Sequence, residues 1–220
     1  MEYIDLSLWD GRKQSFPKGT ASLQVISAMK PHNWEEVLAV KVNGKTVDLT
    51  HPLMESAQLE PVMFLSEEGQ EIYRHTTSHI MAQAVKSLFP GVKITIGPSI
   101  EDGFYYDFDY DKTFTPEDLT VIEHKMAEII ALQLPLVRTE RTSEEAIKLF
   151  EEKGESYKVE LIREINEEKV TLYQQGDFID LCRGPHLPST GYVKAFKLLN
   201  IAGAYWRGDE RNVMLQRIYG

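Results

Sequence analysis

Short runs of alternating hydrophobic and polar residues, typical of β-strands, dominate the first part of the chain. Two such runs flank Asp10-Gly11 and two more flank Asn43-Gly44, and both dipeptides favour the tight turn of a β-hairpin. Between the hairpins, residues 20–29 have apolar positions near helical spacing, and a last strand is expected within residues 58–65. This order predicts a small ubiquitin-like α+β fold over residues 1–62.

Residues 63–220 form a second, larger unit in which helical periods alternate with strands. Ser66 and Thr115, each followed by acidic residues, are expected helix N-caps, and Thr20 or Ser22 is the expected cap in the first unit. Two shorter helices are expected over residues 143–154 and 157–165, and strands over residues 92–110, 170–182 and 195–207. The fold class is therefore α+β, with a mixed or antiparallel sheet packed by helices.

Composition fits a soluble globular protein of one large or two modest domains, since the 220 residues are 42% hydrophobic and 26% charged. No apolar run of about 18 residues exists, so no membrane span is expected. The first residues are acidic where a secretory signal needs basic ones. The single cysteine excludes an internal disulfide, and a reduced, cytoplasmic location is expected.

The net charge of −10 argues against a nucleic-acid partner, but the charge is unevenly distributed. From Cys182 to Gly220, six Lys and Arg face two acidic residues, a local net charge of +4. Aromatic residues are interleaved with these cations, which is typical of a surface that faces RNA. The same pattern fits an ordinary solvated sheet face, and the charge alone leaves both interpretations open.

His75 and His79 lie four residues apart on a predicted helix, so both imidazoles share one face. This spacing suits a metal site or two groups that flank a substrate. The zinc metalloprotease pattern requires a glutamate directly after the first histidine, and the chain has Thr76 there. A protease of that type is excluded.

Cys182 and His186 form a second pair with the same spacing, around a Gly184-Pro185 bend. Together with the first pair they would complete a four-ligand set suited to zinc. The simpler alternative is structural histidines and a small core cysteine. A nucleophilic Cys182, activated by His186 or Lys158, is less favoured because no nucleophile elbow is present.

Other polar candidates lie in loops and at element ends. Tyr105 and Tyr106 should point to opposite faces of a strand, so that one lines a pocket. Asp180, two residues before the cysteine, should share its side of a strand. Lys158 near a helix start indicates, by itself, an exposed lysine, and Gly97-Pro98 would let the backbone approach a ligand closely.

Several long blocks of the chain, in order, resemble bacterial threonyl-tRNA synthetases: RHTTSHIMAQAVKSLFP, IGPSIEDGFYYDFD, YKVELI, QGDFIDLCRGPHLPSTGYVKAFKLLNIAGAYWRGD and MLQRIYG. Residues 1–62 resemble the TGS-type N-terminal domain of that family. Residues 63–220 resemble its editing domain and the start of the linker to the aminoacylation core. The resemblance covers essentially the whole chain.

This resemblance implies proofreading by hydrolysis of mischarged seryl-tRNA(Thr). Serine lacks one methyl group of threonine, and one methyl in a pocket discriminates by only about 1–3 kcal/mol. A synthetic site that accepts threonine therefore cannot exclude serine by size. A second site can exclude threonine by steric clash and hydrolyse what still fits.

The resemblance also implies roles for particular residues. His75 and Lys158 match positions that handle the water and the leaving group. Five others match the pocket around the serine and the terminal adenosine: His79, Tyr106, Asp180, Cys182 and His186. The related alanyl-tRNA synthetase editing domain holds zinc with a similar set. For this chain no catalytic metal is expected, and the ligands of a zinc ion, if one binds, would be His75, His79, Cys182 and His186.

The expected partner is the acceptor end of tRNA(Thr) carrying serine, without a membrane. Nothing resembles the ATP-binding motifs of an aminoacylation core, so ATP and the zinc of that core would belong to a part that this sequence lacks, and aminoacylation is not expected. The piece is expected to be a monomer and the full-length enzyme a homodimer. Two alternatives remain: a non-enzymatic RNA-binding or regulatory TGS module, and a zinc-dependent hydrolase of small esters.

Overall fold

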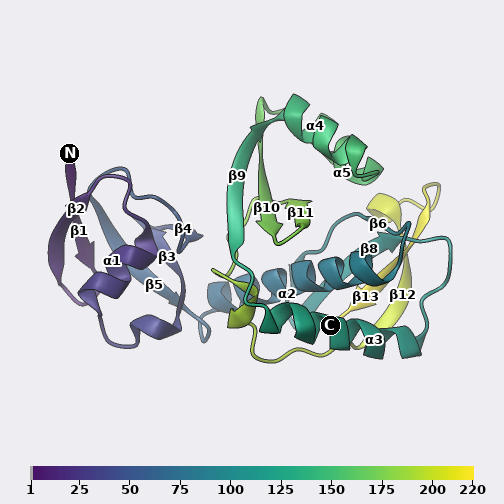
Figure 1. Cartoon of the computed structure of the whole chain (residues 1–220), viewed down its shortest axis with the longest axis horizontal. Helices are drawn as coiled ribbons and strands as arrows, with labels where there is room; N and C mark the ends of the chain where they lie inside the picture. Colours follow the sequence, from purple (N-terminus) through teal and green to yellow (C-terminus); the bar gives the residue numbers. More distant parts are fainter. Residues whose placement is uncertain (1) are drawn as a thin grey trace. The chain divides into compact units, whose positions relative to one another are not determined.

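The computed structural model describes residues 2–220, which divide into two units (Figure 1). By internal contacts, the first unit extends to Tyr73 and includes Gly184–Pro188. The second unit comprises Arg74–Arg183 and Ser189–Gly220. The sequence pattern places the boundary after residue 62, one residue before the end of the last strand of the first sheet (Ala57–Met63).

The first unit contains a five-stranded sheet in the order β2-β1-β5-β3-β4, with β1 and β5 parallel and the other pairs antiparallel. Its elements are β1 (Tyr3–Leu8), β2 (Lys13–Pro17), α1 (Ser22–Met29), β3 (Val37–Val42), β4 (Lys45–Asp48) and β5 (Ala57–Met63). Both predicted hairpins are confirmed, because β1–β2 turns at Asp10-Gly11 and β3–β4 turns at Asn43-Gly44. The predicted last strand is also present as β5.

The predicted N-cap of α1 is wrong, because the cap position is Ala21 rather than Thr20 or Ser22. The Thr20 hydroxyl donates to the carbonyl of Pro17, and the Ser22 hydroxyl donates to the carbonyl of His51. Both hydroxyls therefore hold neighbouring loops. The Gln24 side chain instead accepts the free N–H of Ala21 at the helix start.

The second unit is α+β with antiparallel sheets, as the sequence predicts. One sheet has the order β11-β10-β9, and the other has the order β12-β13-β8-β6 with β7 beside β8. The elements are α2 (Glu67–Leu88), β6 (Lys93–Ile94), β7 (Ser99–Ile100), β8 (Gly103–Asp109), α3 (Pro116–Ala131), β9 (Leu136–Thr142), α4 (Ser143–Glu152), α5 (Ser156–Ile165), β10 (Lys169–Gln175), β11 (Phe178–Leu181), β12 (Asn200–Tyr205) and β13 (Met214–Tyr219).

The predicted N-caps of α2 and α3 are confirmed. The Ser66 hydroxyl accepts the N–H of Gly69, and the Thr115 hydroxyl accepts the N–H of Asp118. Two strands were not predicted, β9 and β13. The mostly charged sequence of β9, LVRTERT, hides its alternation, yet β9 pairs with β10 along its full length. The strand expected over residues 195–207 is confirmed only for Asn200–Tyr205.

Helices α4 and α5 cover one face of the three-stranded sheet through a common apolar cluster. Val159 and Ile162 of α5 pack there with Leu172 of β10 and Ile179 of β11. Because side chains alternate along a strand, Asp180 points to the other face of β11. Packing of α5 on this sheet thus fixes the distance between the start of α5 and the end of β11. Among residues 2–220, no helix is both long and apolar enough to cross a lipid bilayer.

Candidate functional site

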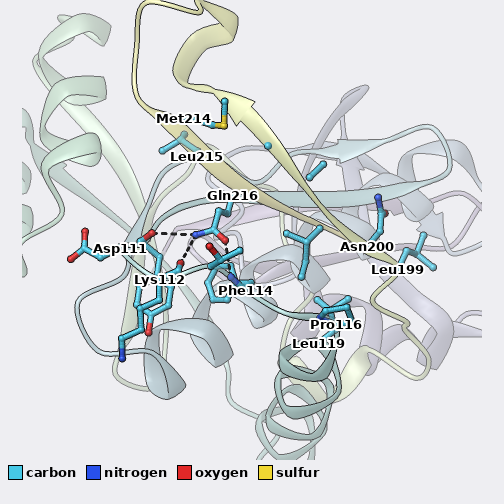
Figure 2. Close-up of a pocket in the computed structure, with 15 residues that line it drawn as sticks. Asp111, Lys112, Phe114, Pro116, Leu119, Leu199, Asn200, Met214, Leu215 and Gln216 are labelled. Carbon is cyan, nitrogen blue, oxygen red and sulfur yellow. Dashed lines mark hydrogen bonds between the residues drawn. The ribbon is translucent and has the colours of Figure 1, made fainter.

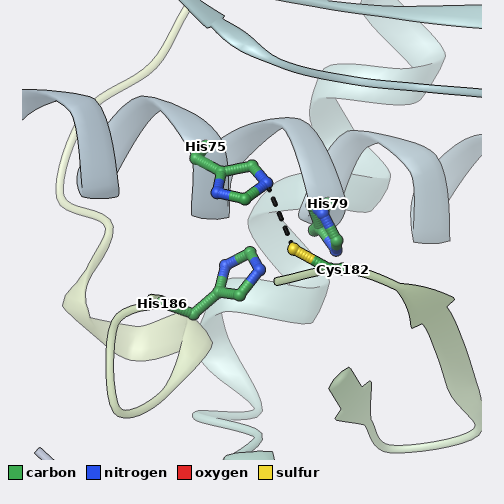
Figure 3. Close-up of side chains that lie close together, drawn as sticks. All are labelled: His75, His79, Cys182 and His186. Atoms are coloured by element: carbon green, nitrogen blue, oxygen red, sulfur yellow. Dashed lines mark hydrogen bonds between the residues drawn. The ribbon is translucent and has the colours of Figure 1, made fainter. Parts of the chain in front are cut away.

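Helix α2 carries His75 and His79 one turn apart, and their rings meet edge to face with centroids 4.9 Å apart (Figure 3). His79 is buried, whereas His75 is partly accessible to solvent. The helix is anchored from the side by Gln175, whose amide donates to the carbonyl of His79 over 3.3 Å and to the Gln83 side chain over 2.9 Å. Sequence reasoning missed Gln175, because a glutamine before a hairpin turn resembles an exposed strand end.

Cys182 is the first residue after β11, and its Sγ lies 3.4 Å from Nε2 of His75 (Figure 3). The Cys182 N–H donates to the carbonyl of Thr171, which extends the β10–β11 ladder by one residue and fixes the cysteine's direction. The potential ligand atoms of His75, His79 and Cys182 all lie within 4.8 Å of one another. The structure thus brings together one member of the second predicted pair and both members of the first.

His186 follows Cys182 by four residues and is drawn with the other three side chains in Figure 3. It is buried and belongs to Gly184–Pro188, the segment that clusters with the first unit. There its backbone N–H donates to the carboxylate of Asp48 over 2.7 Å.

Lys158 and Asp180 form an ion pair in the interior of the second unit, where their side chains are 2% and 1% exposed. Lys158 lies in the first turn of α5, beside the buried Tyr157 and Val159. The indication of an exposed lysine, drawn from its neighbours in the sequence, is therefore wrong. A buried ammonium and a buried carboxylate are stable only because they neutralise each other and have further polar partners.

Tyr106 supplies the further partner of this ion pair. Its hydroxyl donates to Oδ2 of Asp180 over 2.6 Å and accepts from the Lys158 ammonium over 3.0 Å. The prediction that the two neighbouring tyrosines point to opposite faces is confirmed, since Tyr106 is buried while Tyr105 lies partly exposed under the guanidinium of Arg217. The same carboxylate oxygen of Asp180 lies 3.7 Å from Nδ1 of His79, which joins the network to α2.

Both histidines of the cluster are neutral at neutral pH. Burial lowers the pKa of His75 to about 4, an effect that Asp180 opposes and Lys158 reinforces. Burial, with the added repulsion of His75 and Lys158, also lowers the pKa of His79 well below 6.5. Burial and Asp180 raise the pKa of Tyr106 well above 10, so it remains a hydrogen-bond donor. The positive charge of the site therefore comes from Lys158, and His75 is unprotonated at neutral pH.

His75, His79 and Cys182 also offer two imidazole nitrogens and one sulfur, donors that zinc prefers. However, the buried Lys158 ammonium repels positive charge on both imidazoles. The donor set fits a metal, whereas the cation beside it weakens the binding of a divalent ion.

The positive charges of the basic segment from Cys182 to Gly220 are largely paired with carboxylates in the structure. Arg217 makes two hydrogen bonds to Asp107, and three other cations face carboxylates in the same way, in the pairs Lys197–Glu123, Arg207–Glu160 and Arg211–Asp209. The acidic partners come mostly from residues before Cys182. The local attraction for a polyanion is therefore weaker than the residue count indicates.

Two hollows of the second unit help to delimit the site. A hollow of about 180 Å³ is lined by Cys182 and Arg183 over an apolar floor that includes Leu161 and Ile165. A larger one, of about 710 Å³, lies beside β12 (Figure 2), and its described lining does not include the predicted site residues. There the Gln216 amide donates to the carbonyls of the loop before α3. The larger hollow is therefore separate from the histidine cluster.

The chain is similar along its whole length to proteins named threonine–tRNA ligase. The relative from Geobacter sp. (strain M21) is 54% identical over 220 residues, covering 100% of this chain and 35% of the relative. The relative from Carboxydothermus hydrogenoformans is 51% identical over 218 residues, covering 99% and 34%. Residues 170–219 match the family described as threonyl and alanyl tRNA synthetase second additional domain. The resemblance to bacterial threonyl-tRNA synthetases is thus confirmed, and the chain spans about a third of the length of these relatives.

The lowered pKa of His75 predicts a loss of stability in acid. Between pH 6.5 and about 4 the unfolded chain binds a proton at this position and the folded chain does not, so the free energy of unfolding falls as the pH is lowered. The contribution is at most about 3 kcal/mol, and less where solvent reaches the ring. Urea denaturation at pH 7 and pH 4.5 should show a smaller fall for His75→Gln than for the unsubstituted protein.

His124→Gln is the matched control, because His124 is exposed on α3. It should lose stability in acid as the unsubstituted protein does. An equal fall for His75→Gln and the unsubstituted protein would show that His75 is not held neutral by the fold.

Proposed function

We propose, from the similarity of the whole chain to bacterial threonyl-tRNA synthetases, that it hydrolyses the ester bond of mischarged seryl-tRNA(Thr). The observation that supports this most is the neutral His75 beside a buried, hydrogen-bonded cation, Lys158. A base that is unprotonated at neutral pH and a fixed positive charge are two groups that assist ester hydrolysis. A protein that only binds RNA has no need to bury a lysine next to two neutral histidines.

The proposed reaction uses water as the nucleophile. His75 takes a proton from a water molecule as its oxygen attacks the ester carbonyl, and the negative charge develops on the carbonyl oxygen. When the bond to the ribose oxygen breaks, the protonated histidine returns the proton to that oxygen. The products are serine and tRNA with a free hydroxyl group. Asp180 stabilises the imidazolium formed in between, because its charge partly offsets the burial that lowers the pKa of His75.

Lys158 acts without direct exposure to solvent. Its ammonium is enclosed by Asp180 and the Tyr106 hydroxyl, so it contributes a fixed field and holds the orientation of both partners. In a buried site such a preorganised charge stabilises a developing negative charge without reorganisation. The same charge makes a metal ion unnecessary, and we infer that hydrolysis proceeds without one.

Selection by size completes the proposal. Serine would fit beside Cys182 and the histidines, and the extra methyl of threonine would clash there.

We infer that the first unit is a TGS-like β-grasp domain, which is supported by the strand order β2-β1-β5-β3-β4 with a parallel central pair. The partner would be the acceptor end of tRNA(Thr) carrying serine.

A direct test compares release of the two amino acids. The chain should release serine from seryl-tRNA(Thr) and leave threonyl-tRNA(Thr) largely intact, with a rate ratio on the order of tenfold or more. Serine release should continue in the presence of a metal chelator. Equal rates for both substrates, or no release at high protein concentration, would contradict editing, and loss of activity on chelation would instead support a zinc hydrolase.

The assigned roles predict large effects from two substitutions. His75→Ala removes the base and Lys158→Ala leaves Asp180 as an unpaired buried charge, so each should slow single-turnover serine release by about 100-fold or more. His124→Ala and Lys148→Ala are matched controls on exposed helix faces and should retain the full rate. Full activity of His75→Ala would show that another group, or the substrate itself, activates the water.

A further inference from the structure

Gly97 lies directly across from Tyr106, between two backbone hydrogen bonds. The N–H of Asp107 donates to the carbonyl of Ile96 over 3.0 Å, and the N–H of Tyr105 donates to the carbonyl of Pro98 over 3.3 Å. Residues 96–98 therefore run antiparallel to β8, although they are not part of a regular strand. The two bonds bracket Gly97 and Tyr106 as a cross-strand pair.

The Tyr106 ring occupies the space that a side chain at position 97 would need. A Cβ added to Gly97 would overlap Cδ2 of the ring and lie 2.5 Å from Cε2 and 2.7 Å from Cγ. Real Cβ atoms essentially never approach another heavy atom closer than 3.0 Å. Gly97 does not have a positive φ, unlike Gly91, whose added Cβ would meet nothing within 4 Å. Glycine is thus required at position 97 for space and not for backbone conformation.

The position of this ring decides where the Tyr106 hydroxyl lies. One edge of the ring rests on the Gly97 backbone, and Phe108 stacks with the ring at a centroid distance of 5.2 Å. The hydroxyl at its far end reaches Asp180 and Lys158. Because a tyrosine has only two side-chain torsions, pushing the ring away from Gly97 also moves the hydroxyl away from the ion pair.

Ser78 connects the same glycine to the helix that bears the histidines. Its buried hydroxyl lies 2.6 Å from the carbonyl oxygen of Gly97 and 2.8 Å from that of His75, and it donates its one proton to either of them. Ser78 precedes His79 directly in α2. Gly97 therefore contacts two elements of the site. Its carbonyl is bonded to Ser78 of α2, and the Tyr106 ring lies where a side chain of residue 97 would be.

We propose that Gly97 is a positioning residue of the hydrolytic site: it leaves room for the Tyr106 ring and so aims the hydroxyl at the Lys158–Asp180 pair. This inference rests on the proposed function, because it assigns Gly97 a role in that reaction. A glycine that served only packing would affect stability but not catalysis by the folded protein. A positioning glycine affects catalysis through the Tyr106 hydroxyl, and the two roles can be separated.

A double-mutant cycle separates them. Gly97→Ala should lower kcat for serine release by on the order of tenfold or more, with KM changed by less than about threefold. In the Tyr106→Phe background the hydroxyl is already absent, so the same substitution should lower kcat by less than about twofold. Equal effects of Gly97→Ala in both backgrounds would overturn the proposal.

Two further variants support the cycle. Gly203→Ala is the matched control: Gly203 lies in β12 of the same sheet without a positive φ, and an added Cβ would meet only the flexible Met214 side chain at 3.2 Å or more. It should leave kcat unchanged. If Gly97→Ala does not fold, Ser78→Ala removes the hydrogen bond to Gly97 without adding an atom. It should lower kcat in the unsubstituted protein and not in Tyr106→Phe, and equal effects would again overturn the proposal.

A crystal structure of Gly97→Ala gives a readout independent of activity. The distance between the Tyr106 hydroxyl and Asp180, now 2.6 Å, should increase beyond hydrogen-bonding range, about 3.5 Å. A retained hydrogen bond, or a displaced hydroxyl with unchanged kcat, would overturn the inference. If the unsubstituted chain releases no serine, the proposed function is wrong, and this distance alone decides whether Gly97 positions Tyr106.

Discussion

The buried ion pair between Lys158 and Asp180 is the constraint on which the second unit depends. Each charge would be very costly to bury alone, and removal of one partner from such a pair typically costs about 3–5 kcal/mol. The pair therefore requires that the start of α5 and the end of β11 meet, with Tyr106 of β8 close enough to bond to both. The apolar packing of α4 and α5 on the three-stranded sheet supplies the free energy that holds these elements in place.

The same pair modulates the protonation of the histidines. Their burial keeps His75 and His79 neutral, and the single cation of the network adds to this effect. A neutral imidazole can bind a metal or accept a proton, and the neighbouring ammonium disfavours both, a divalent ion more strongly than a single proton. Three similar donors can thus serve different chemistry depending on one lysine.

Local signals in the sequence predicted what local contacts determine. The hairpins at Asp10-Gly11 and Asn43-Gly44 and the cap at Ser66 were predictable, because each depends on residues within a few positions. Other contacts decided the rest. The Thr20 hydroxyl bonds to nearby Pro17 and the Ser22 hydroxyl to distant His51 instead of capping α1, and the charged strand β9 is defined by its pairing. In the site, spacing identified the histidines and Cys182. No local pattern reveals the burial of Lys158, because its partners Asp180 and Tyr106 come from distant parts of the sequence. None reveals the contact of Gly97 with Tyr106, because Gly97 lies in a short irregular segment without periodicity.

We infer that the Lys158–Asp180–Tyr106 network serves catalysis in addition to its structural role. The most direct test of this inference is single-turnover serine release by the triple variant Lys158→Met/Asp180→Leu/Tyr106→Phe. Replacing all three polar groups together leaves no buried charge unpaired, so the protein should fold with a stability within about 2 kcal/mol of the unsubstituted chain. If the network serves catalysis, this folded variant should release serine about 100-fold more slowly or not at all. Release at the unsubstituted rate would contradict it.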